Sequence, residues 1–386
     1  MTGVDLSSRL ATMNESATLA LNARAKQLAA EGKTIYNLTA GELATDTPDY
    51  IQEAVAKTLD KNKYTPVAGL SELREKIAAH AREFYGLNWI QPANVVVTGG
   101  AKPALYATFL SLINPGDEVI IPAPAWVSYM DLVELVGGKV INAPLTASYD
   151  LDTTVIKSKI TSKTKAILIT SPHNPTGSIF SKQAIDKLAA DLKGTNITLI
   201  SDDIYSALVY DDDFTLVPKA GFDNLVIING FSKSQALTGW RIGYLIADKA
   251  IADAATTLLS HITGNASVPS QYAAIAAMEN DDKPPHTTIN DLKASRQIVV
   301  DGLTGIPGLK HNVPGGAFYV FLDLRELSDN SAQWCEDLLA ETGVVLVPGE
   351  AFIAPGFARL TFSGDNQNLQ KAVAEIKRFI GKGGKI

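Results

Sequence analysis

The chain has 386 residues and a formal net charge of −7, with 46% hydrophobic and 19% charged residues. This length predicts two domains, the composition is typical of a soluble enzyme, and the lack of basic blocks argues against nucleic acid as a partner. The single cysteine, Cys335, predicts no internal disulfide, and the five scattered histidines predict no metal site. There is no long apolar run and no leader-like start, which predicts no membrane association and a cytoplasmic location.

The first segment with a clear pattern spans residues 16–32, where apolar residues recur at helical spacing. A short apolar run at residues 35–38 follows and leads to Gly41. A strand that ends in glycine allows a ligand to approach the backbone closely. A simple turn at Gly41 is the alternative interpretation.

Two further helices are predicted before the first long strand. Pro48 stands at the first position of one of them, and residues 71–85 form the other. Tyr64 lies in the loop between these helices. Exposed loop tyrosines usually have no specific role, so the local sequence assigns none to Tyr64.

A buried strand at residues 95–98 runs into Gly99 and Gly100, and a helix over residues 104–113 follows Pro103. A strand, glycines and a helix start together direct free backbone N–H groups and the positive helix end toward an anion. We interpret residues 100–102 as a phosphate-binding loop. The spacing of the dinucleotide-binding fingerprint is absent.

Short apolar strands then alternate with helices as far as residue 247, and this pattern predicts a mostly parallel α/β sheet covered by helices on both faces. The expected strands are 118–121, 139–142, 166–170, 198–201, 225–228 and 243–247, with helices at 126–136 and 182–192. Ligands of such sheets bind at the carboxyl ends of the strands. The residues that follow strand ends are Gly99, Gly100, Trp126, Asn174, Asp202 and Lys233.

The pattern changes after residues 283–285. Helices at 290–302, 332–341 and 369–380 alternate there with strands near 317–322 and 359–362. We therefore expect a large domain over residues 48–283 and a smaller α+β domain over 284–386. An N-terminal arm, residues 1–47, is expected to join the small domain.

The stretch NGFSKSQALTGWRIGY, residues 229–244, holds an isolated lysine after a buried strand. Apolar surroundings and the cation of Arg241 favour the neutral amine of Lys233, which suits Schiff-base chemistry. An ordinary surface lysine is the alternative. The cofactor that makes such chemistry useful is pyridoxal phosphate, whose ring stores electrons released at the substrate's α-carbon.

Such a cofactor needs partners for its ring and for its phosphate. Asp202 can pair with the ring nitrogen, while Tyr205 and Asn174 can contact the ring oxygen. Trp126 can stack on the ring. The phosphate can be bound by Arg241, Ser232, Gly100, Ala101 and Lys102.

Four motifs together resemble the class I and II aminotransferases, which are fold-type I pyridoxal-phosphate enzymes: SPHNPTG (171–177), SDDIY (201–205), FSKSQALTGWRIGY (231–244) and ARLTFS (358–363). The resemblance implies that Lys233 carries the cofactor and shuttles the proton. It also implies that Arg359 clamps the substrate α-carboxylate, and that Tyr64 reaches the phosphate of a neighbouring subunit in a homodimer with shared sites. His173 is interpreted as packing.

The stretches LTAGE, KYTPVAG and PAWVSY most resemble a bacterial branch of aspartate aminotransferases. In that branch a lysine at the position of Lys102 meets the side-chain carboxylate of the substrate; a solvated Lys102, or one that only assists the phosphate, is the alternative. The substrate is then expected to contact Gly41, Lys102, Trp126, Asn174 and Arg359. Residues 41–45 read GELAT where the family has GEPDF, so the Pro and Phe that help closure are missing.

The first functional hypothesis is an aspartate:2-oxoglutarate aminotransferase that works in two half-reactions. An aromatic amino acid or prephenate aminotransferase is the alternative on the same site. A β-lyase on this scaffold and a non-catalytic sensor represent two other functional classes.

Overall fold

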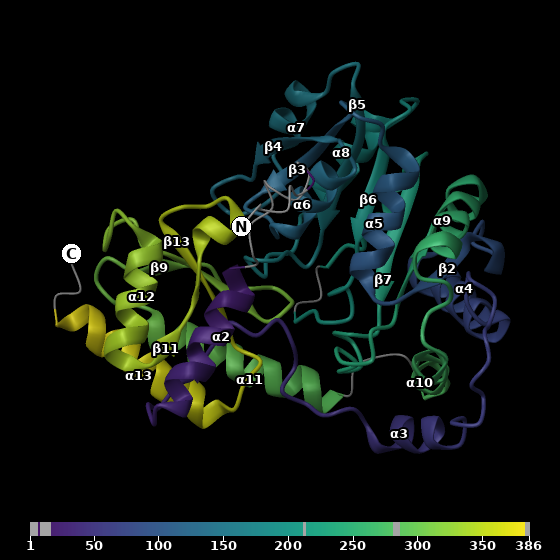
Figure 1. Cartoon of the computed structure of the whole chain (residues 1–386). Helices are drawn as coiled ribbons and strands as arrows, with labels where there is room; N and C mark the ends of the chain where they lie inside the picture. Colours follow the sequence, from purple (N-terminus) through teal and green to yellow (C-terminus); the bar gives the residue numbers. More distant parts are fainter. Residues whose placement is uncertain (1–6, 8–16, 211–213, 281–285, 383–386) are drawn as a thin grey trace, which may run out of the picture.

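A computed structural model describes residue 7 and residues 17–210, 214–280 and 286–382 (Figure 1). Its central element is a seven-stranded sheet of order β2-β8-β7-β6-β5-β3-β4. Only β8 runs antiparallel to its neighbours. The expected mostly parallel α/β sheet is therefore confirmed. The strands are β2 (Val95–Thr98), β3 (Glu118–Ala123), β4 (Lys139–Pro144), β5 (Thr164–Thr170), β6 (Thr198–Asp202), β7 (Leu225–Gly230) and β8 (Gly243–Ile246).

Both faces of this sheet are covered, because its strands are apolar on both sides. In β6, for example, Leu199 belongs to one hydrophobic core and the next residue, Ile200, belongs to another. The first core includes α3 (Asp49–Ala56), α4 (Ser71–Tyr85), α7 (Thr153–Lys159), α8 (Lys182–Leu192) and α10 (Val268–Glu279). The second includes α5 (Ala101–Leu112), α6 (Ser128–Leu135) and α9 (Lys249–Ile262).

Some details differ from the sequence-based expectation. Pro48 is the N-cap of α3 rather than its first residue, and α6 begins at Ser128 rather than at residue 126. Helix α5 begins at Ala101 rather than after Pro103, because a proline in the first turn of a helix lacks only an N–H that would have no partner there. Helices α7, α9 and α10 lie in stretches where no element was expected. Short 3-10 turns at η1 (Pro92–Asn94), η2 (Val217–Ala220) and η3 (Gly349–Phe352) complete the connections.

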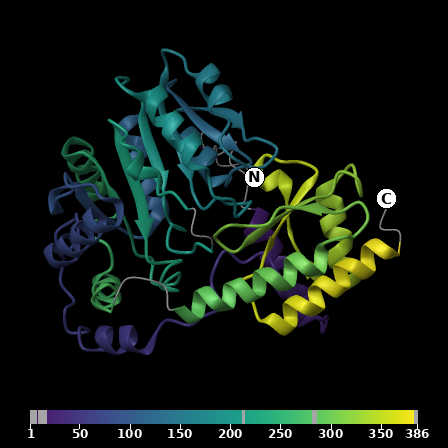
Figure 2. The same ribbon diagram turned by 180° about the vertical axis from the view of Figure 1, so that it is seen from behind.

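A second unit contains a four-stranded antiparallel sheet of order β12-β13-β10-β9. These strands are β9 (Lys310–His311), β10 (Tyr319–Asp323), β12 (Val347–Pro348) and β13 (Phe357–Thr361). Helices α11 (His286–Leu303) and α13 (Asn366–Gly381) pack side by side against it (Figure 2), and α12 (Ser331–Thr342) belongs to the same core.

The N-terminal segment joins this second unit. Strand β1 (Tyr36–Asn37) pairs in parallel with β11 (Val344–Val345), Leu38 lies in the second unit's core, and α2 (Ala17–Ala30) lies beside that unit. We propose that residues 1–47 and 284–386 form the small domain and residues 48–283 the large one. The expected boundary at 283–285, like residues 1–6 and 8–16 of the arm, lies outside the described residues.

One of the contacts between the two units is a loop, residues 312–317, which we name the strap. The strap packs closely against Gly177, where an added Cβ would lie 2.5 Å from the Cβ of Pro314 and 3.0 Å from the carbonyl oxygen of Gly316. Backbone hydrogen bonds join the strap to the loops after β5 and β6: Tyr210 N to Gly315 O at 2.9 Å, Gly316 N to Gly177 O at 3.0 Å and Ala317 N to Leu208 O at 2.8 Å.

None of the helices in the described ranges combines the length and the apolar character that crossing a membrane requires.

Candidate active site

Asn174, Asp202 and Lys233 lie at or just after the carboxyl ends of β5, β6 and β7, which are adjacent parallel strands. Thr170 pairs with Asp202, and Asp202 pairs with Ile228, so the three strands end level with one another. The sheet therefore brings these three residues to one edge, as the sequence predicted.

Asp202 is buried and accepts two hydrogen bonds. Its Oδ2 accepts from the hydroxyl of Tyr129 at 2.7 Å, and its Oδ1 accepts from the backbone N–H of Ile204 at 3.3 Å. Burial raises the pKa of the Asp202 carboxyl to about 6, although these two hydrogen bonds and the charge of Lys233 act to lower it. Because burial disfavours its charged form, the Asp202 carboxylate would be stabilised by a cationic partner.

The neighbouring Asp203 belongs to a different environment. Its Oδ1 accepts a 2.5 Å hydrogen bond from the hydroxyl of Ser201, and the hydroxyl of Tyr85 also interacts with it. Burial raises the pKa of Asp203 to about 7, and the charge of Asp202 adds to the rise. Successive side chains of a strand point to opposite faces, which explains why the two acids differ.

Lys233 is mostly enclosed, and its Nζ donates a hydrogen bond to the carbonyl oxygen of Gly41. Burial lowers the pKa of Lys233 to about 8. The charges of Glu42 and Asp202 act against this fall, whereas Arg359 and Arg241 add to it. The surroundings are not those of an ordinary solvated surface lysine.

The glycine loop and Arg241 meet at the start of α5. Gly100 has φ +104, and a Cβ on it would lie 2.7 Å from the Nη2 of Arg241. A Cβ on Gly243 of β8 would likewise lie 2.7 Å from the backbone N of Ala101, so both glycines are needed for this approach. Ser232 is buried directly before Lys233.

Lys102 and Trp126 form a pair beside this loop. The Nζ of Lys102 lies 4.8 Å from the ring centroid of Trp126, and the Trp126 ring meets Tyr129 edge-on at 5.2 Å. Burial lowers the pKa of Lys102, Arg241 lowers it further, and Asp131 acts in the opposite direction. Lys102 is consequently a partly desolvated cation.

Arg359 of β13 is buried, with its guanidinium over the rings of Tyr319 at 4.4 Å and Phe352 at 4.9 Å. Its Nη1 donates to Asn174 Oδ1 at 3.1 Å and its Nη2 to Thr39 O at 2.9 Å. The Nε has no hydrogen-bond partner, and no described carboxylate forms an ion pair with the group. Burial lowers the pKa of Arg359.

A family model for aminotransferase class I and II matches residues 33–376. The chain belongs to the class I and II aminotransferases. An aspartate aminotransferase from Thermotoga maritima is 40% identical over 97% of this chain and 99% of its own length. An aspartate/prephenate aminotransferase from Thermus thermophilus is 35% identical over 98% of this chain and 99% of its own length.

Solved structures agree with the fold of this aminotransferase. The Thermotoga maritima aspartate aminotransferase superposes with a TM-score of 0.92 at 39% identity, covering 97% of this chain and 100% of that one. The Thermus thermophilus aspartate aminotransferase with maleate gives 0.93 at 35% identity, covering 98% and 100%. The predicted family and the fold-type I architecture are confirmed.

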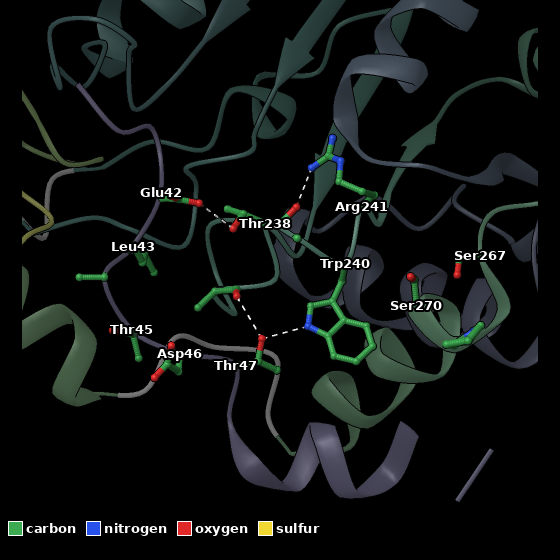
Figure 3. Close-up of a pocket in the computed structure, with 14 residues that line it drawn as sticks. Glu42, Leu43, Thr45, Asp46, Thr47, Thr238, Trp240, Arg241, Ser267 and Ser270 are labelled. Atoms are coloured by element: carbon green, nitrogen blue, oxygen red, sulfur yellow. Dashed lines mark hydrogen bonds between the residues drawn. The ribbon is translucent and has the colours of Figure 1, made fainter. Parts of the chain in front are cut away.

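In this aminotransferase, a cavity of about 710 Å³ lies beside Arg241 and the GELAT segment (Figure 3). Residues 42–47 form one wall, and residues 236, 238–241, 267, 269 and 270 form the other. The hydroxyl of Thr238 donates to Glu42 Oε2 at 3.0 Å, and Trp240 Nε1 donates to the hydroxyl of Thr47 at 2.9 Å. The GELAT segment thus borders open space. It is held by hydrogen bonds from Lys233 to Gly41, from Thr238 and Ser363 to Glu42, and from the Ala44 N–H to the Ser363 carbonyl.

Tyr64 is 99% exposed, so its side chain does not pack against the described part of its own chain. Tyr129 and Tyr319 contact site residues but were not among the sequence-based candidates. Tyr129 follows Trp126 by three residues near the start of the expected helix 126–136. Residues three apart lie on the same face of a helix, so this spacing was a signal that Tyr129 accompanies Trp126. Tyr319 had no local signal.

Proposed function

We propose that this aminotransferase uses pyridoxal phosphate to move the α-amino group of L-aspartate to 2-oxoglutarate. The observation that carries the proposal is Arg359, a buried guanidinium with a free Nε and no ion-paired carboxylate among the described residues. An unpaired buried cation is costly, so an anionic ligand is expected beside it. A substrate α-carboxylate meets this requirement.

The donor set fits pyridoxal phosphate. The buried Asp202 would pair with the ring nitrogen, Tyr205 and Asn174 would bind the ring oxygen, and Trp126 would lie against the ring. The phosphate would be bound by Arg241, Ser232 and the loop Gly100, Ala101 and Lys102. When bound, the cofactor supplies an electron sink for the pair released at the α-carbon.

The roles of the protein groups follow from their surroundings. Lys233, whose pKa is lowered to about 8, has a neutral fraction near neutral pH that an ordinary lysine lacks. Its Nζ would carry the cofactor and, once displaced by substrate, would take up the α-proton. Tyr129 would orient the Asp202 carboxylate through its 2.7 Å hydrogen bond. Gly41 would let the backbone lie close to the substrate.

The choice of an acidic substrate rests on Lys102. Its partly desolvated ammonium beside Trp126 would pair with a side-chain carboxylate, while a neutral substrate would leave that charge unpaired. Relatives named aspartate aminotransferase support aspartate, and the similar Thermus thermophilus aspartate aminotransferase was solved with maleate, itself a dicarboxylate. The relative named aspartate/prephenate aminotransferase makes prephenate the second candidate.

We further propose a homodimer in which Tyr64 reaches the phosphate of the neighbouring subunit, since its 99% exposed side chain is available for such a contact. A cytoplasmic location is also proposed. The buried thiol of Cys335, the single cysteine, is compatible with a reducing compartment.

The test is the visible absorption of the cofactor-loaded protein before and after aspartate alone is added. Conversion of the aldehyde form of the cofactor to the amine form, reversed by 2-oxoglutarate, is the expected result. Turnover with phenylalanine or prephenate exceeding that with aspartate would replace the substrate. Release of ammonia and pyruvate without an oxo-acid acceptor would identify a lyase instead.

A further inference from the structure

Tyr319, the first residue of β10, contacts two of the proposed site residues at once. Its hydroxyl lies 2.7 Å from the hydroxyl of Tyr205, and the two rings meet edge-on with centroids 5.7 Å apart. The face of the same ring carries the guanidinium of Arg359 at 4.4 Å. Tyr319 therefore links the group proposed for the cofactor's ring oxygen to the group proposed for the substrate carboxylate.

The backbone fixes this arrangement. Tyr319 pairs with Thr361 and Phe321 pairs with Arg359 in the antiparallel β10–β13 ladder, so both contacting side chains project from neighbouring strands. Tyr205 comes from the other domain, after β6. Tyr319 and Tyr205 are both buried, at 1% and 5% exposure, so water does not compete for their hydroxyls.

We propose that Tyr319 is a positioning residue whose hydroxyl donates to the Tyr205 oxygen and whose ring supports Arg359. This inference rests on the proposed function. A phenol has one proton to donate and accepts through its oxygen. When Tyr319 donates, Tyr205 keeps its own proton for the ring oxygen of the cofactor. The accepted hydrogen bond also makes Tyr205 a stronger donor.

Other groups around the pair do not replace this function. Burial raises the pKa of both phenols, so both remain protonated. Without cofactor, Tyr319 and its hydrogen bond raise the pKa of Tyr205 further, and the charged groups that act on Tyr205 are Arg359, which lowers this pKa, and Asp202, which raises it. The charges that act on Lys233 come from Glu42, Arg359, Arg241 and Asp202. All of these are retained when only the Tyr319 hydroxyl is removed.

The decisive variant is Tyr319→Phe, which keeps the ring over Arg359 and deletes the hydroxyl. A weaker Tyr205 donor stabilises the ring-oxygen anion less, so the cofactor–Lys233 linkage binds its proton more tightly. The pH at which the cofactor's visible absorption titrates should rise by about half a unit to one unit. The KM for aspartate should change less than twofold, because Arg359 keeps its support.

Tyr210→Phe is the matched control, since the buried Tyr210 hydroxyl donates to the Ala317 carbonyl across the same domain boundary. This substitution deletes a hydrogen bond between the domains, and that hydrogen bond involves neither Tyr205 nor Arg359. Its titration midpoint should equal that of the wild type. A purely structural role for Tyr319 would instead give the same midpoint in the wild type and both variants, and this would overturn the inference.

A double-mutant cycle measured by pyridoxal phosphate binding gives a readout independent of turnover. Tyr319→Phe should raise the Kd several-fold when Tyr205 is present and leave it unchanged in a Tyr205→Phe background. Equal effects in both backgrounds would contradict the proposed link. A wild-type protein that binds the cofactor but responds to no amino acid would refute the proposed function, a result distinguishable from either outcome of the cycle.

Discussion

Asp202 and Lys233 stand at the ends of adjacent strands, whereas Arg359 reaches its two hydrogen-bond acceptors across 185 and 320 positions of the chain. The cofactor side of the proposed site is assembled by one sheet. The substrate side is assembled from the N-terminal segment, β10 and β13, which meet only when the small domain is complete. The two sides therefore depend on different parts of the fold.

This difference indicates where each side is vulnerable. Changes at the cofactor side should remove chemistry without much loss of structure, because the sheet holds its strand ends in place. Changes at the substrate side should affect affinity and selectivity, because those residues bind carboxylates. Variants of the two sides should therefore differ in whether they lose turnover or substrate affinity.

Lys233→Ala should lower turnover by at least about 10⁴-fold, because both the covalent anchor and the proton-transferring amine are lost. Steady-state kinetics with aspartate and 2-oxoglutarate measure this. Lys249→Ala, at an exposed lysine paired with Asp253, is the control and should retain full turnover. Wild-type activity in the Lys233 variant would refute the assignment of the cofactor side.

Arg359→Lys should raise the KM for aspartate by about 10- to 100-fold, because lysine keeps the charge but loses the planar fork. The spectrum of the bound cofactor without substrate should stay close to that of the wild type. Arg325→Lys is a suitable control, since Arg325 makes a comparable two-bonded contact with Asp323 at the surface. A large spectral change with normal KM would assign Arg359 to the cofactor side instead.

Lys102→Met should lower kcat/KM for aspartate by about tenfold and leave that for phenylalanine unchanged. The reason is that only the dicarboxylate pairs with the ammonium beside Trp126. Equal losses of kcat/KM for both substrates would instead assign Lys102 to phosphate binding. No loss for either substrate would show that Lys102 has no role in selectivity. Lys182→Met, at an exposed lysine, provides the unaffected reference.

Asp203→Asn tests whether burial keeps the carboxyl next to Asp202 protonated. The pKa of Asp203 is raised from 3.8 to about 7, so the folded state binds its proton more tightly than the unfolded state does. The resulting stabilisation is complete below about pH 4 and is lost as the pH rises to 7. The variant should thus gain about 1–3 kcal/mol in unfolding free energy relative to wild type between pH 5 and 8.

Urea unfolding of the cofactor-free protein at the two pH values measures this gain. Asp186→Asn, at a half-exposed acid paired with Lys182, should show no comparable trend. A pH-independent difference for Asp203→Asn would mean that the carboxyl is not protonated by burial.

Sequence reasoning performed better on the cofactor side for a physical reason. A buried strand followed by Asp202, or by Ser232 and Lys233, is a local pattern, and parallel strand ends meet at one edge by geometry alone. The contact between Arg359 and Tyr319 depends on the register of β13 against β10, which no local pattern specifies. Arg359 was found only through family resemblance, and Tyr319 was not found.

The helices that the sequence analysis did not predict also fall into two groups, those with a local sequence signal and those without one. Helix α9 has an apolar stripe and an Asp248 cap that accepts from the N–H of Ala250 at 2.8 Å, signals that the sequence did contain. Helix α10 is rich in alanine and buried over most of its surface, so it shows no helical stripe. Its existence follows from packing between α3 and α4 rather than from periodicity.

The strap also constrains how the enzyme moves. Its hydrogen bonds to Gly177, Leu208 and Tyr210 tie the small domain to the loops that follow Asn174 and Tyr205. Any relative motion of the domains that keeps these hydrogen bonds must be a rotation about an axis that passes close to the strap. The part of the small domain nearest the strap therefore travels least. A swing of the GELAT segment beside the 710 Å³ cavity has to break the hydrogen bond from Lys233 Nζ to the Gly41 carbonyl, which couples that motion to the residue proposed to carry the cofactor.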